Sequence, residues 1–127
     1  MPLQVELVSP ERILWSGEAD MVVARTSEGD IAFLTGHAPF IGALGIGAVT
    51  IRATDGQDER AAVHGGFVEV SGDRVTILSD VAELASDIDA TRARRALEQA
   101  ERRTGDQDDV EAEAALRRAR LRVEIAS

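Results

Sequence analysis

The spacing of apolar residues changes once along the chain. Up to residue 85, apolar residues tend to recur at every second position, and turn residues interrupt them at short intervals. Beyond residue 89 the apolar spacing becomes three or four, and alanine, arginine and glutamate dominate. A period of two is typical of strands and the longer period of helices. We therefore predict an α+β chain with a β domain over residues 1–85 and a helical hairpin over residues 86–127.

Within the β domain, alternation at residues 3–7 places Leu3, Val5 and Leu7 toward a core. We expect Gly17 to end one strand. The Asp55-Gly56 pair predicts a two-residue hairpin turn, and residues 71–73 predict a second turn. About eight to ten short strands of this kind do not fit one flat sheet with a solvent-exposed face, so the pattern predicts an antiparallel β-sandwich.

The C-terminal region reads as two helices packed as an antiparallel hairpin. Asp89 suits the first N-terminus, because its carboxylate can accept the free N–H groups of the first turn. Thr104 and Gly105 should end this helix, and Asp108 or Asp109 should begin the next. The apolar stripes are rich in alanine and bury little area, so we expect the hairpin to depend on docking. The two stripes comprise Ala93, Ala96, Leu97 and Ala100, then Ala112, Ala115, Leu116, Ala119 and Val123.

Charge and composition exclude several classes of function. The net charge is −9, and residues 1–85 hold 5 arginines against 13 acids, while aromatic residues make up only 3%. Such a surface repels nucleic acid and offers little for stacking on bases. The chain has no cysteine, which excludes disulfides and thiol chemistry. No apolar run reaches the roughly 20 residues of a membrane helix, and no signal-peptide pattern is present.

No group of residues forms a recognisable catalytic centre. His37 and His64 lack a second histidine at ligand spacing, so a metal site is not expected. The glycine-rich residues 42–47 lack the Lys-Ser/Thr ending of a phosphate-binding loop. Arg118 and Arg122 project from one helix face, where they could either complement the helix dipole or hold a phosphate. The residues alone leave both readings open.

Three motifs give the chain a resemblance to a known family. Residues 29–39 are similar to the pattern G-E-x-G-x-x-P-G-H-A-P, with Ala32 and Thr35 in place of a glycine and a proline. A run resembling G-G-F-x-E-V followed by V-T-x-L stands at residues 65–70 and 75–78. The sequence I-D-A-T-R-A at residues 88–93 resembles the family motif that opens the helical hairpin. In these motifs the chain resembles the epsilon subunit of the bacterial F-type ATP synthase.

The resemblance implies a β-sandwich of about ten strands, a C-terminal hairpin and a non-catalytic role in the central stalk. Its implied partners are the gamma subunit and the c-ring, and the catalytic alpha and beta subunits when the hairpin extends to inhibit ATP hydrolysis. The implied location is the cytoplasmic face of the membrane, reached only through the complex. The loop implied to face the c-ring would use Ser27, Glu28, Asp30 and His37.

The family also suggests a regulatory ligand, since in some members the folded hairpin binds ATP; no cofactor is otherwise required. A different hypothesis is a free-standing ATP-sensing protein, which would not copurify with a gamma subunit. Carried over position by position, the ATP site would comprise Glu83, Ile88, Asp89, Arg92, Arg118 and Arg122.

Overall fold

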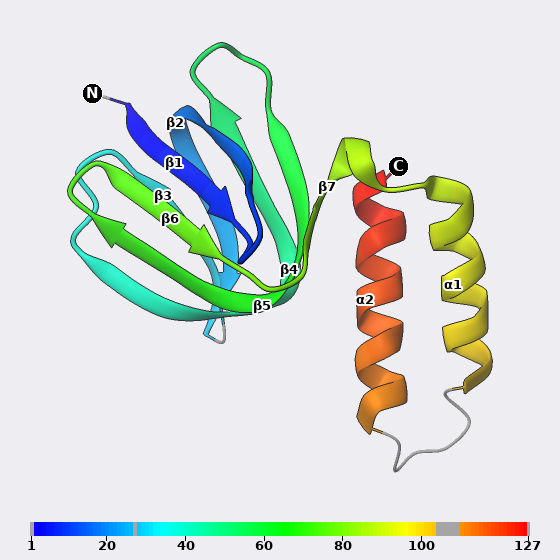
Figure 1. Cartoon of the computed structure of the whole chain (residues 1–127). Helices are drawn as coiled ribbons and strands as arrows, with labels where there is room; N and C mark the ends of the chain where they lie inside the picture. Colours follow the sequence, from blue (N-terminus) through cyan, green and yellow to red (C-terminus); the bar gives the residue numbers. More distant parts are fainter. Residues whose placement is uncertain (1, 27, 104–109, 127) are drawn as a thin grey trace.

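The computed structural model describes residues 2–26, 28–103 and 110–126. Seven strands come first, a short 3-10 turn follows, and two helices end the chain (Figure 1). The strands are β1 (Leu3–Val8), β2 (Ile13–Thr26), β3 (Gly29–Leu34), β4 (Phe40–Ala53), β5 (Glu59–Ser71), β6 (Arg74–Leu78) and β7 (Ala82–Leu84). The turn and the helices are η1 (Ala85–Asp87), α1 (Ala90–Arg103) and α2 (Val110–Ala126).

The strands form one strongly curved sheet that closes on itself. Its order is β1-β6-β5-β4-β2-β3, β1 also pairs with β2, and β7 pairs with β5. This closure gives the layered, barrel-like β domain of Figure 1. Two expectations need correction. The described residues contain seven strands rather than about ten, and β1 runs parallel to β6, so the sheet is not wholly antiparallel.

The lower strand count has a physical cause in the glycines. Gly17 does not end a strand but lies inside β2, where it pairs with Val5. The ring of Trp15 lies over Gly17 and occupies the space that a Cβ atom would take. Gly65 and Gly66 likewise lie within β5 at positive φ. Glycine lets a strand bend sharply without leaving the ladder, so one long strand serves both layers of the domain.

The core fills the inside of the curved sheet and follows the predicted alternation. Leu3, Val5 and Leu7 are buried, as are Val49 and Ile51, whereas Gln4 is exposed. Phe33 on β3 is the largest fully buried side chain. These residues belong to one cluster that involves no helix residue, so the β domain has a core of its own.

The two predicted turns have different outcomes. Ser71 pairs with Arg74 across a two-residue connection in which Gly72 has φ +60°, which confirms this hairpin. The connection between β4 and β5 is longer than predicted. Gly56 has φ +83° and donates its N–H to the Ala53 carbonyl, while Asp55 caps the loop by accepting the Gln57 N–H at 2.8 Å. Asp55 itself has no positive φ, so this is not the two-residue turn that the Asp-Gly pair suggested.

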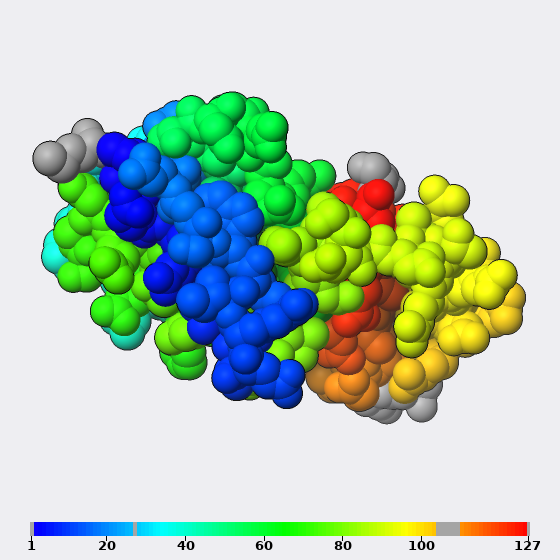
Figure 2. Space-filling model, turned by 45° about the horizontal axis from the view of Figure 1, so that its top comes forward, coloured from blue at the N-terminus to red at the C-terminus, as the bar shows by residue number. Residues whose placement is uncertain are grey.

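The helices form the predicted pair, with α2 placed between α1 and the β domain. Figure 2 shows α1 at the far end of the molecule and α2 beside the strands. Ala93 and Ala100 of α1 are buried, as are Ala112 and Ala119 of α2, which fits the alanine stripes. A separate small cluster joins Leu121 and Ile125 of α2 to Ala62 of β5. The predicted helix ends at Thr104, Gly105, Asp108 and Asp109 lie outside the described residues.

Candidate functional site

An open pocket of about 430 Å³ lies where the β domain meets the helices. It collects residues from β7, η1, the start of α1 and the C-terminal half of α2. Five of the six residues predicted for an ATP site line it, although they are up to 39 positions apart in sequence. The lining residues are Glu83, Asp87, Ile88, Asp89, Arg92, Ala93, Ala96 and Arg122.

Asp89 holds the start of α1 at the mouth of this pocket. Its Oδ1 accepts the backbone N–H of Arg92 at 3.1 Å, and its carbonyl accepts the N–H of Ala93 at 2.9 Å. These contacts confirm the predicted N-cap, which satisfies donors that the helix itself leaves free. The cap places Arg92 in the first turn, so its side chain and Asp89 line the same opening.

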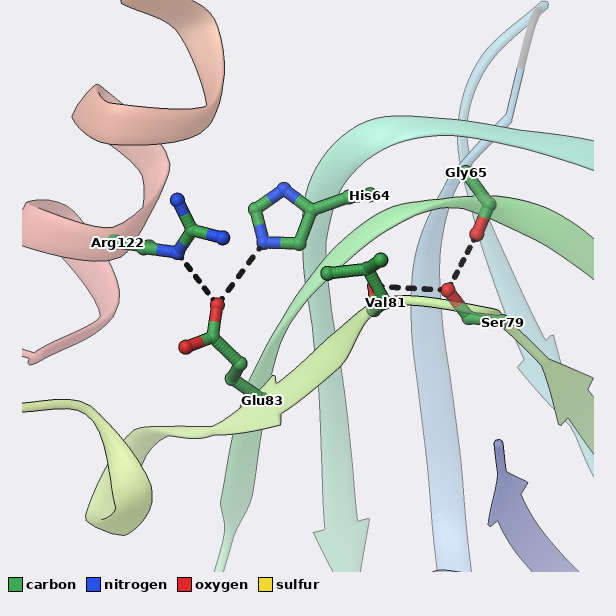
Figure 3. A network of polar contacts seen from close by, with 6 residues as sticks. All are labelled: His64, Gly65, Ser79, Val81, Glu83 and Arg122. Atoms are coloured by element: carbon green, nitrogen blue, oxygen red, sulfur yellow. Dashed lines mark hydrogen bonds and ion pairs between the residues drawn. The ribbon is translucent and has the colours of Figure 1, made fainter. Parts of the chain in front are cut away.

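Glu83 connects the pocket to both neighbouring layers. Its Oε1 accepts the Arg122 Nε–H at 2.6 Å, which ties β7 to α2. The same oxygen lies 3.3 Å from Nε2 of His64 on β5. Because a carboxylate only accepts hydrogen bonds, Nε2 is the protonated nitrogen in this contact. Figure 3 shows Arg122 and His64 beside each other, with both of their contacts ending on the same oxygen of Glu83.

His64 is the buried member of this network, with a side chain only 2% exposed. Burial lowers its pKa below the ordinary value, and the positive charge of Arg122 adds to this effect, while the hydrogen bond and charge of Glu83 oppose it. No sequence pattern indicates this role, because His64, Glu83 and Arg122 come from three distant segments. Only the pairing of β5 with β7 and the docking of α2 bring them together.

Arg118 is the predicted site residue that the pocket does not include. It forms an ion pair with Glu111 on its own helix at 2.6 Å, and its side chain is 29% exposed. It stands one turn before Arg122 on α2, as the spacing required. Its ion-pair partner therefore lies on α2 and not in the pocket.

The described residues among those predicted to face a c-ring do not gather in one place. Ser27 lies outside the described residues. Glu28 and Asp30 are exposed at one end of β3, where Asp30 pairs with Arg25 at 3.1 Å. His37 follows the other end of the strand, roughly 17 Å away, and packs edge-on against Phe33 with ring centroids 5.0 Å apart. The two turns are therefore separate surfaces.

Two exposed apolar side chains mark another part of the β domain. Phe67 and Leu78 pair across β5 and β6 and are 57% and 46% exposed. They border a hollow of about 400 Å³ that is also lined by Val8 and Pro10. We call Phe67 and Leu78 the Phe67 patch.

Within residues 2–26, 28–103 and 110–126, no three histidine or acidic side chains gather as metal ligands would. No helix in the same part of the chain is long and apolar enough to cross a membrane.

The β domain matches a family model along almost its entire length. The model describes the beta-sandwich domain of the ATP synthase Delta/Epsilon chain, and it matches residues 2–85. An ATP synthase epsilon chain of Streptomyces avermitilis is 53% identical over 98 residues, which are 77% of this chain and 79% of the relative. That of Thermobifida fusca is 50% identical over 123 residues, covering 94% and 90% of the two chains. That of Halalkalibacterium halodurans is 43% identical over 129 residues, covering 98% and 96%.

Solved structures show the same fold at much lower identity. A chain of the mitochondrial ATP synthase of Euglena gracilis superposes with a TM-score of 0.83 at 24% identity, covering 98% of this chain and 81% of that one. A chain from the central stalk and c-ring of the Tetrahymena thermophila enzyme gives 0.63 at 16% identity, covering 100% and 98%. With the family model and the bacterial relatives, these findings show that the chain belongs to the epsilon-chain family of the ATP synthase, whose members are non-catalytic subunits.

Proposed function

We propose that the chain works in the central stalk of a bacterial ATP synthase. Residues 1–85 would bind the gamma subunit and the c-ring, and residues 86–127 would regulate ATP hydrolysis by leaving the β domain and extending toward the catalytic alpha and beta subunits. The complex would hold the chain at the cytoplasmic face of the membrane. Family membership supports the setting, and the Phe67 patch supports a protein partner on the β domain.

The Phe67 patch is the observation that carries the assignment of a binding surface. A small domain rarely leaves large apolar side chains exposed side by side, because water contact is unfavourable for each of them. Phe67 and Leu78 are held next to each other by strand pairing, so the patch exists before any partner arrives. We assign this patch to the gamma subunit.

The acidic character of the β domain fits a second contact, with the c-ring. Glu28 and Asp30 are exposed at the β2–β3 turn, within a domain of net charge −8. Acids at such a turn would attract a cationic loop on the ring. Because His37 lies at the opposite end of β3, any ring contact through it would be a separate one.

Replacing Phe67 tests the gamma assignment. The change Phe67→Glu puts a charge into the patch, where a partner would have to desolvate it without a counter-charge. We expect at least about a tenfold loss of affinity for the gamma subunit, measured by copurification and by titration of the purified proteins. The matched control is Val110→Glu, at an apolar residue on α2 that is 75% exposed.

The comparison of these two variants decides the assignment. Val110→Glu should bind the gamma subunit as the wild type does. If Phe67→Glu remains folded and binds with unchanged affinity, the gamma subunit does not use this patch.

A regulatory ATP site is favoured by one specific observation, the assembly of five predicted residues around one pocket. Arg92 forms no ion pair with any other described residue and is therefore available for a phosphate. The pocket also contains three carboxylates, from Glu83, Asp87 and Asp89. A nucleotide would have to offset their repulsion, for example with a bound divalent cation.

Titration of the full chain with ATP tests this site. We expect Arg92→Ala to weaken ATP binding about tenfold or more, because a charge-assisted contact to phosphate is lost. Arg94→Ala is the control, since Arg94 is an exposed arginine on the same helix that does not line the pocket. Equal binding by both variants, or no binding of ATP by the wild type at millimolar concentration, would exclude the site.

A further inference from the structure

The contact between α2 and the β domain is small. Its apolar part consists of Leu121 and Ile125 of α2 packed on Ala62 of β5, with a few half-buried neighbours. Among the described residues, two ion pairs join α2 to the β domain. Arg122 pairs with Glu83 of β7 at 2.6 Å, and the more exposed Arg60 of β5 pairs with Glu124 at 3.9 Å. A contact of this size is sensitive to the gain or loss of a single charge.

His64 is buried within this contact. Its Nε2 donates to Glu83, and its side chain is 2% exposed. Its other ring nitrogen, Nδ1, is buried and has no hydrogen-bond partner among the described residues. Neutral imidazole tolerates this arrangement, because an unprotonated Nδ1 carries no N–H that would need an acceptor.

We propose that His64 is a proton-binding switch between the β domain and the hairpin: when neutral it permits docking of α2, and when protonated it releases α2. The step is the binding of one proton at Nδ1. No ligand or further residue is required, and the proposal does not depend on ATP binding.

The groups around His64 act on the added charge in different directions. Protonation creates an N–H at Nδ1 that has no acceptor among the described residues, which is costly in a buried place. Arg122 and Arg118 on α2 repel the new charge. Glu83 on β7 attracts it, but the same Glu83 oxygen already accepts from Arg122. On β4 the residue paired with His64 is the uncharged Ile46.

The direction of the pH effect follows from linkage. The pKa of His64 is lowered in the docked protein, whereas after undocking water reaches the ring and its pKa returns toward 6.5. The undocked form therefore binds the proton more tightly. The contribution of neutral His64 to docking is fully present above pH 6.5 and is lost as the pH falls below that value. For one proton, the equilibrium constant of docking falls by at most about tenfold per pH unit.

Energy transfer between two dyes measures docking directly. The chain contains no cysteine, so Gln57→Cys on the β domain and Gln99→Cys on α1 provide the only two labelling sites. Both positions are exposed. The measurement is made on the full chain from about pH 8 to about pH 5, a range in which histidine titrates. It is repeated with Leu121→Ala, which weakens docking without touching His64 and brings the undocked fraction into a measurable range.

The two histidines of the chain supply matched variants. His64→Gln keeps a donor to Glu83 but cannot be protonated, so the pH response should disappear. His37→Gln, in the connection between β3 and β4, should leave the response unchanged. The proposal is overturned if the Leu121→Ala protein shows no response below pH 6.5, or if His64→Gln retains it.

Nuclear magnetic resonance gives a second measurement that does not depend on the folding of His64→Gln. The imidazole signals of the full wild-type chain are followed through a pH titration. A His64 midpoint below 6.5 supports the switch. A midpoint at or above that value overturns it, because docking would then not oppose protonation.

Discussion

At the scale of single residues, Gly66 is the position where the β domain tolerates no side chain. Its φ is +124°, and a Cβ atom there would lie 2.0 Å from the carbonyl oxygen of Leu78. The obstacle is backbone, which cannot rotate away as a side chain could. Gly66 thus allows β5 to bend closely around β6 at the edge of the Phe67 patch.

We expect Gly66→Ala to destabilise the protein by at least about 2 kcal/mol, from backbone strain and overlap with Leu78. Chemical denaturation of the full chain measures this loss. Gly45→Ala is the control, because Gly45 has no positive φ and a Cβ atom there would meet nothing within 4 Å. If both variants lose a similar amount of stability, then β4 and β5 are destabilised by any added side chain, and the geometry at Gly66 is not the cause.

The candidate ATP site could be predicted residue by residue only in part. The motif at residues 88–93 identified Ile88, Asp89 and Arg92 because these residues are close in sequence and share one helix start. Arg122 lines the same pocket, while Arg118 pairs with Glu111 outside it. The partnership of His64 with Glu83 had no local signal, since neither residue type nor spacing specifies which strands pair.

At the scale of elements, the long strands and α2 show two different reasons why the apolar pattern predicts the structure only in part. Alternation along residues 3–7 identified the buried face correctly, because a strand has one inward side. Gly17 is expected to end a strand, although in the curved sheet it lies inside β2, where glycine allows a bend. The three-residue strand β7 is too short for alternation to indicate it.

Helix α2 has apolar residues on two sides because it has two neighbours. Ala112 and Ala119 belong to the alanine stripe recognised in the sequence, whereas Leu121 and Ile125 pack on Ala62 of the β domain. A helix with two apolar sides has no strongly preferred face, so its periodicity identifies only one of them. This arrangement explains why α1 lies at the far end of the molecule in Figure 2.

At the scale of the whole molecule, the β domain has a core of its own, and a second, separate apolar cluster joins the hairpin to it. The core of the β domain contains no helix residue, and the cluster at α2 is much smaller. A structure of this kind allows the helices to leave while the sheet stays intact. This property is what the proposed regulatory role of residues 86–127 requires.

Deletion of residues 86–127 tests the division of labour in the complete ATP synthase. We expect the shortened chain to assemble with the complex, because the Phe67 patch lies wholly within the β domain. ATP hydrolysis by the complex should rise or stay level, since the proposed inhibitory segment is gone. Failure of the complex to assemble would contradict the proposal, and the undeleted chain is the control.

The sequence by itself determined the order of a strand-rich and a helical region, the inward faces of the regular strands, the Asp89 cap and the family. Each of these depends on residues that are close together, where period and local hydrogen bonding decide. Tertiary structure alone decided that the sheet closes, that β7 adds to β5, and that α2 brings Arg122 onto Glu83 beside His64. These contacts join segments as far as 70 residues apart, as in the pairing of Gln4 with Arg74, and their geometry exists only once the strands have paired and the helix has docked.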